Sequence, residues 1–411
     1  MQGSPTMSLN SRQTVDHNLR MLVIELFWAA LAIACYSFAS AYVIRLGGSN
    51  LHVSLITSAA ALVNALTSIP FAIFLERRSQ RWPWVVGSLW ALRIGHLGLI
   101  AIPLLPAFRA EAVVALLLLV NIPVALFNAG WLPMFADVVP LNRRAGLLSA
   151  RNMTLNITLM ITTFVMGLWL DHAPFPFNYQ LMFGFAALTS FISTLYVSRM
   201  IIPDSPVVAA TPARLSLGQL RELIGQQRPF VNITINTLIF NIAFWMGTPL
   251  QPIYFVRELN ATDGWIGLWL GLISGGAILG NLIWPRLINR HGYAWVLGRA
   301  TLLSAAYYFL IGFFPDLNLI LAFALFFGMV SPGVDISHFN TLLEVCDPER
   351  RALYVSIFVT VMNAGFFLSA LLAAPLLDLI DARTLVLILA GLRLTGALLF
   401  RINPVRAASL A

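Results

Sequence analysis

Two short stretches of the chain carry nearly the same pattern of charge. Residues 136–145 read ADVVPLNRRA, and residues 343–352 read LEVCDPERRA. When the two are superimposed, Asp137 meets Glu344 and the two Arg-Arg-Ala triplets coincide. Each stretch joins two long apolar runs. The pattern indicates that the chain is internally duplicated, with one acid–Arg-Arg element between apolar segments in each half.

The composition predicts an all-α polytopic membrane protein. Of the 411 residues, 59% are hydrophobic and only 10% are charged, whereas about a quarter of an ordinary soluble domain is charged. Segments that cross a bilayer need roughly 20 apolar residues and must be helical, because lipid offers no partner to unpaired backbone groups. Twelve runs meet this requirement, at residues 21–44, 52–75, 83–105, 112–137, 146–171, 178–201, 230–256, 264–285, 293–314, 317–343, 353–378 and 384–402.

The longest link between these runs divides them into six and six. It covers residues 202–229 and contains four prolines. We therefore predict an N-terminal tail over 1–20, a six-helix bundle over 21–201, a linker over 202–229, a second six-helix bundle over 230–402 and a C-terminal tail over 403–411. The duplication recurs elsewhere: Tyr42 and Arg45 close the first span as Tyr254 and Arg257 close the seventh.

The arginines predict the orientation. All 25 basic residues are Arg, and if the N-terminus is cytoplasmic, 17 of them fall in cytoplasmic segments and 4 in outer loops. Such a bias is the positive-inside signature. We expect an integral protein of the plasma (inner) membrane with both termini cytoplasmic.

The net charge of +8 could also suggest a nucleic-acid partner. Loops that face anionic lipid explain the charge better, so we expect the bilayer and no nucleic acid. The two cysteines, Cys35 and Cys346, lie in different halves and predict no disulfide framework or metal site. The chain lacks a Gly-x-x-x-x-Gly-Lys phosphate loop, and indeed any Lys, which argues against an ATPase.

Twelve spans in two sets of six around a central cytoplasmic loop resemble the major facilitator superfamily. That family has a Gly-x-x-x-Asp-Arg-x-Gly-Arg loop between spans two and three. Here Glu76 and Arg77 occupy the places of the acid and the following Arg, while Ala72 and Ser79 replace the glycines. The resemblance implies two bundles built from inverted three-helix repeats, with a solute cavity between them. The branch is not assignable, because the signatures of drug–proton antiporters and sugar porters are both missing.

The resemblance also implies a charged latch at the inner face, where Asp137 and Glu344 match the acid that closes span four and its counterpart. We hypothesise that ion-pair networks hold the cytoplasmic mouth shut in one state and break in the other. The alternative is a set of solvated loop charges, since surface pairs contribute only about 0–1 kcal/mol. The predicted cytoplasmic gate consists of Glu76, Arg77, Asp137, Arg143, Arg144, Glu344, Arg350 and Arg351.

Charges inside a span cost about 2.5–3.5 kcal/mol each and need a reason. Asp335 and His338 are three residues apart in span ten and share a helical face. Both types of side chain can exchange protons, so we predict a proton-coupling or cation-binding site. A buried hydrogen-bonded pair that stabilises helix packing is the alternative, and two ligands are too few for zinc.

Asparagines concentrate on the spans that line the cavity in the family. Such residues either hydrogen-bond a neighbouring helix or face a wet cavity. Arg151 is either a snorkelling side chain or a cavity residue that attracts an anion, and we favour the second. The predicted cavity set is Asp335, His338, Asn128, Arg151, Asn152, Asn156, Asn236 and Asn363.

These patterns predict a secondary active transporter that moves a small solute by alternating access, coupled to protons. We expect a monomer without catalytic residues, metal or cofactor. The alternatives are a transporter-fold receptor, a lipid-moving protein without ion coupling and, less favoured, a membrane-embedded enzyme.

Overall fold

The computed structural model describes residues 9–78, 80–202, 227–346 and 351–402. Within these ranges the regular structure is entirely helical. Twelve segments are long and apolar enough to cross a membrane. The structure thus confirms the predicted all-α fold with twelve spans.

Each half supplies six spans, and three of the spans are interrupted helices. The first half contains α1 (Leu9–Tyr36), α2 (Ala39–Arg45), α3 (Asn50–Glu76), α4 (Trp82–His96), α5 (Gly98–Ala101), η1 (Ile102–Leu104), α6 (Arg109–Val138), α7 (Leu141–His172) and α8 (Phe177–Ser198). The second contains α10 (Arg228–Ile253), η2 (Tyr254–Glu258), α11 (Asp263–His291), α12 (Tyr293–Phe313), α13 (Leu317–Val345), α14 (Arg351–Leu379) and α15 (Ala382–Ile402).

The first helix begins at Leu9, well before the predicted start of the span at Met21. The amide of Asn18 donates to the carbonyl of Ile201 over 2.7 Å, and its oxygen accepts from the Ile201 N–H over 2.9 Å. These bonds tie the polar start of α1 to the end of α8, so part of the predicted tail is docked helix. Residues 1–8, 203–226 and 403–411, which hold the rest of both predicted tails and most of the linker, lie outside the described residues.

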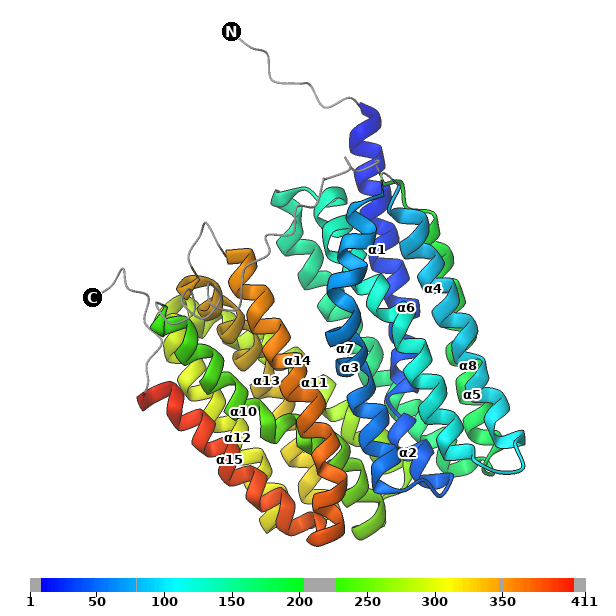
Figure 1. Cartoon of the computed structure of the whole chain (residues 1–411), viewed down its shortest axis with the longest axis vertical. Helices are drawn as coiled ribbons and strands as arrows, with labels where there is room; N and C mark the ends of the chain where they lie inside the picture. The colour runs from blue at the N-terminus through cyan, green and yellow to red at the C-terminus, as the bar shows by residue number, and fades with distance from the viewer. Residues whose placement is uncertain (1–8, 79, 203–226, 347–350, 403–411) are drawn as a thin grey trace.

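Both chain ends lead toward one end of the helices, which we call the proximal end; the opposite end is the distal end (Figure 1). Polar caps start several helices at the distal end, where the first backbone N–H groups need partners. Ser49 caps α3, Thr262 caps α11 and Asp316 caps α13. Asp381 accepts from the backbone N–H of Thr384, which holds the pKa of its carboxyl below the ordinary value.

The helices of each half pack mainly on one another. In the first half α1 packs on α7 and α8, and α6 packs on α3 and α4. In the second half α10 packs on α14 and α15, and α13 packs on α11 and α12. Two long pairs, α7 with α11 and α3 with α14, join the halves. The two sets of ribbons meet at the distal end and diverge toward the proximal end (Figure 1).

The halves also share internal details. The hydroxyl of Tyr42 donates to the carbonyl of Leu99 over 3.3 Å, and that of Tyr254 donates to Ile311 over 3.3 Å. In each half a tyrosine at the end of the first span thereby anchors the third. The duplicated sequence therefore folds into duplicated contacts.

Candidate functional site

Asp335 and His338 both lie on α13, shortly after Pro332, but they do not form a pair. The Nε2 atom of His338 lies 2.6 Å from the Thr237 hydroxyl on α10. Asp335 is exposed, and no described side chain lies within hydrogen-bond or ion-pair distance of its carboxylate. The histidine therefore links α13 to α10, while the aspartate remains open to an outside partner.

Arg393 on α15 is the charged group that influences Asp335. Its side chain is 3% exposed, and its Nη2 donates to the Ser304 hydroxyl over 2.6 Å. The guanidinium lies over the ring of Phe240, 4.1 Å from the centroid. Its positive charge interacts electrostatically with Asp335, although the two do not touch. The predicted cavity set did not include Arg393; the signal that could have found it is an intramembrane charge of opposite sign to Asp335 in the same half.

Arg151 has a partner that the sequence analysis did not assign. Its Nη1 lies 2.7 Å from a carboxylate oxygen of Glu25 on α1, and it also donates to the Leu22 carbonyl. The side chains of Arg151 and Glu25 are only 12% and 7% exposed. In this conformation Glu25 is the main described partner of Arg151, and neither predicted role included it. The ion pair joins α7 to α1.

The predicted asparagines divide into two kinds. Asn236 is buried and donates to the Leu399 carbonyl of α15 over 3.3 Å, a bond that joins two neighbouring helices. Asn128 and Asn152 are exposed. Asn156 donates to the backbone carbonyl of Asn152 over 2.9 Å, and Asn363 is half-buried.

Only part of the predicted cytoplasmic gate, which lies at the proximal end, falls within the residues that the structure describes. Arg77 and Glu344 are exposed, and Arg144 donates to the Val139 carbonyl over 2.9 Å. Arg143 pairs with Asp16, which belongs to the same half. The side chains of Glu76, Asp137 and Arg351, and all of Arg350, lie outside the described residues.

Polar contacts that join the two halves occur at the distal end. Arg45 lies 3.4 Å from the Asp263 carboxylate and donates to the Ala261 carbonyl over 3.2 Å. Arg257 donates to the Asn50 side chain over 2.6 Å and also to the Gly48 carbonyl. Each arginine ends the first span of its half and reaches the loop before the second span of the other half. We call these contacts the distal latch.

Close helix packing surrounds this latch. The hydroxyl of Thr262 donates to Asp171 at the end of α7 over 2.8 Å. A Cβ atom at Gly267 of α11 would collide with the Thr163 carbonyl of α7, and one at Gly167 would lie 3.0 Å from Gly267. Only glycine allows the two backbones to approach this closely. The distal ends of α7 and α11 are therefore fully packed together.

Within the described ranges, no three His, Cys, Asp or Glu side chains cluster as metal ligands. The groups that the described site offers to a ligand are the carboxylate of Asp335, the neutral asparagine amides and the arginines of the distal latch.

The comparisons with known proteins give a consistent answer. The sequence pattern of the Major Facilitator Superfamily matches residues 22–246 and 233–410. No curated protein sequence matches the chain.

Three similar solved structures cover nearly the whole chain. The first is a POT family transporter in complex with a thioalcohol-conjugated peptide (TM-score 0.72, 14% identity, 95% of this chain and 99% of that one). The second is a D-xylose–proton symporter (TM-score 0.71, 14% identity, 97% and 100%). The third is a mutant form of the nucleoside transporter NupG (TM-score 0.70, 14% identity, 96% and 99%). At these identities the likeness shows the fold alone.

Proposed function

Because the chain belongs to the major facilitator superfamily, a family of transporters rather than enzymes, we propose that it moves a small solute by alternating access with a proton as the coupling ion. The solute is one that hydrogen-bonds to neutral amides. Asn128, Asn152, Asn156 and Asn363 bind it, and Asp335 carries the proton. Peptide, xylose and nucleoside, named for the similar structures, all offer such groups.

The exposed carboxylate of Asp335 is the observation that carries this proposal. A carboxylate within a span is stable only beside water or a partner, because lipid solvates it poorly. No described side chain lies within hydrogen-bond or ion-pair distance of Asp335, so water or a ligand is expected to meet it. The positive charge of Arg393 interacts electrostatically with Asp335, and an arriving proton removes that interaction. Proton binding at one face and release at the other then accompany the solute.

The predicted gate at the proximal end and the distal latch are closed in turn, one in each of the two states. With the latch closed, the solute enters and leaves at the proximal end. The excess of arginines there supports a cytoplasmic location for this end, in a plasma-membrane protein. When the latch opens, the acid–Arg-Arg elements of the two halves close the proximal end. The bundles 21–201 and 230–402 move as the two bodies, and one monomer is sufficient.

A ligand screen comes first, with nucleosides, sugars and dipeptides tested at two pH values for stabilisation of the purified protein. The hits are then tested in proteoliposomes that contain a pH-sensitive dye. Wild-type protein is expected to move protons together with the solute. Asp335→Asn is expected to lose proton movement but to retain exchange of labelled solute.

Glu111→Gln is the matched control, since Glu111 is an exposed acid at the distal start of α6. It should behave as wild type. Full proton movement in Asp335→Asn would show that Asp335 does not carry the proton. Solute movement without proton movement in the wild type would contradict proton coupling itself.

A further inference from the structure

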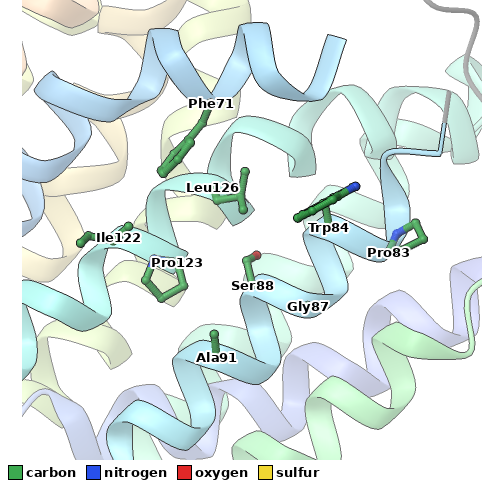
Figure 2. Close-up of a pocket in the computed structure, with 9 residues that line it drawn as sticks. All are labelled: Phe71, Pro83, Trp84, Gly87, Ser88, Ala91, Ile122, Pro123 and Leu126. Atoms are coloured by element: carbon green, nitrogen blue, oxygen red, sulfur yellow. The ribbon is translucent and has the colours of Figure 1, made fainter. Parts of the chain in front are cut away.

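A groove of about 670 Å³ lies on the side of the first half, between α3, α4 and α6 (Figure 2). Its walls include Phe71, Trp84, Ile122 and Leu126. The Ser88 hydroxyl also lines it but donates to the Val85 carbonyl of its own helix over 2.7 Å. The groove therefore offers an apolar surface, of the size of a small-molecule site.

A second, smaller pocket of about 260 Å³ continues the groove. Arg78, Gln80, Pro83 and Trp84 line it, and the last two also line the groove. Arg78 and Gln80 follow the end of α3 and precede the start of α4. The combined site thus has an apolar body between spans and a polar, cationic mouth at the proximal end.

The Arg78 guanidinium is held in place by two aromatic rings. It lies 4.7 Å from the centroid of Phe74 and 4.7 Å from that of Trp84. The two rings meet edge to face at 4.9 Å. These cation–π contacts hold the guanidinium without using its N–H groups, which stay available for hydrogen bonds. No described side chain forms an ion pair with Arg78; the side chain of Glu76 is outside that set.

The groove opens toward the bilayer. Figure 1 shows α4 at the edge of the first half, on the side away from α10–α15. Trp84 and Ile122 are each 43% exposed. In a protein that spans a membrane, exposed apolar walls of this kind meet lipid chains. Basic pockets between spans at the cytoplasmic side suit anionic lipid headgroups.

We propose that this groove is a binding site for an anionic phospholipid, which nothing in the proposed transport function requires. One acyl chain lies along the wall formed by Phe71, Trp84 and Leu126. The phosphate accepts hydrogen bonds from Arg78 and Gln80 at the mouth. Both the apolar groove and its cationic mouth are needed, because contacts with an acyl chain alone do not distinguish a charged headgroup from a neutral one.

Gly87 gives a direct way to fill the groove. A Cβ atom built there meets no atom within 4 Å, so Gly87→Leu blocks the site without disturbing the helix packing. Gly391→Leu is the matched control, because a Cβ atom at Gly391 on α15 also meets nothing within 4 Å. Arg78→Gln removes the charge at the mouth. Arg290→Gln, near the end of α11, controls for the loss of one proximal arginine.

The experiment measures lipid retention by native mass spectrometry of the purified protein, with phosphatidylglycerol and phosphatidylcholine of identical chains. Wild type should retain phosphatidylglycerol preferentially. Arg78→Gln should reduce that preference about fivefold, the equivalent of roughly 1 kcal/mol for one basic residue near anionic lipid. Gly87→Leu should lose the tightest-bound lipid of either kind, and both controls should match wild type.

Three outcomes would overturn the proposal. The first is equal lipid retention in Gly87→Leu and Gly391→Leu, which would place the bound lipid elsewhere. The second is an unchanged headgroup preference in Arg78→Gln. The third is release of the lipid by millimolar inorganic phosphate, which would make the mouth a simple anion site.

Discussion

At the scale of single residues, the charges inside the spans are stabilised in different ways. Glu25 and Arg151 neutralise each other in a nearly dry contact between α1 and α7. Arg393 donates a hydrogen bond to a hydroxyl and lies over aromatic rings, whereas Asp335 remains exposed. The sequence shows that each charge lies within an apolar span, where it is energetically costly. It does not predict which charges form pairs, because pairing depends on which helices become neighbours.

The Glu25–Arg151 contact leads to a stability prediction. Glu25→Gln leaves the arginine buried without a counter-charge, and we expect a loss of about 3–5 kcal/mol in the free energy of unfolding. Glu25→Gln combined with Arg151→Gln should recover much of this loss, since neither charge then remains. Denaturation of the purified protein in detergent measures both.

Asp16→Asn supplies the control for that measurement. Asp16 and Arg143 form an exposed pair, with side chains 52% and 53% exposed, and such pairs contribute at most about 1 kcal/mol. If Glu25→Gln were no more harmful than Asp16→Asn, the buried pair would not stabilise the fold.

At the scale of elements, the crossing of α7 and α11 determines how the two halves meet. The crossing depends on glycines that lie directly against the opposing backbone. The sequence shows Gly264, Gly267 and Gly271 at regular spacing but does not say which helix they face. Only the arrangement of the two halves supplies that partner.

Gly267→Leu tests this crossing. Its side chain collides with the Thr163 carbonyl, so we expect the distal end to open. The reporter is a cysteine in place of Ser54, which is fully buried on α3 near the distal end. Maleimide should label Ser54→Cys faster in the Gly267→Leu background. Gly146→Leu, where a Cβ atom meets nothing within 4 Å, should leave the rate unchanged; equal rates in both backgrounds would contradict the packing argument.

At the scale of the whole molecule, duplication and the count of spans follow directly from the sequence, because hydrophobic length and repeated motifs are local features. The distal latch does not, since its partners come from loops in opposite halves. A signal was present, however: Arg45 and Arg257 are among the few arginines that oppose the positive-inside bias. Both of these exceptions form contacts between the halves.

The latch is tested by removing both arginines. Arg45→Gln with Arg257→Gln should raise the labelling rate of Ser54→Cys about fivefold or more, because each polar contact at a partly exposed site contributes up to about 1 kcal/mol. Arg109→Gln is the control, since Arg109 is also distal but donates to the Leu105 carbonyl of its own half. An unchanged rate in the double variant would mean that helix packing alone closes the distal end.

Alternating access is the central claim, and the distances between the two halves test it most directly. One pair of spin labels replaces Ser149 and Asn289 at the proximal end, outside the predicted gate. Another pair replaces Glu111 and Asn318 at the distal end. All four residues are exposed. Double electron–electron resonance then measures both distances as pH and a stabilising solute are varied. The account predicts that the proximal distance shortens while the distal distance lengthens. Distances that stay fixed, or that change together in the same direction, would contradict it.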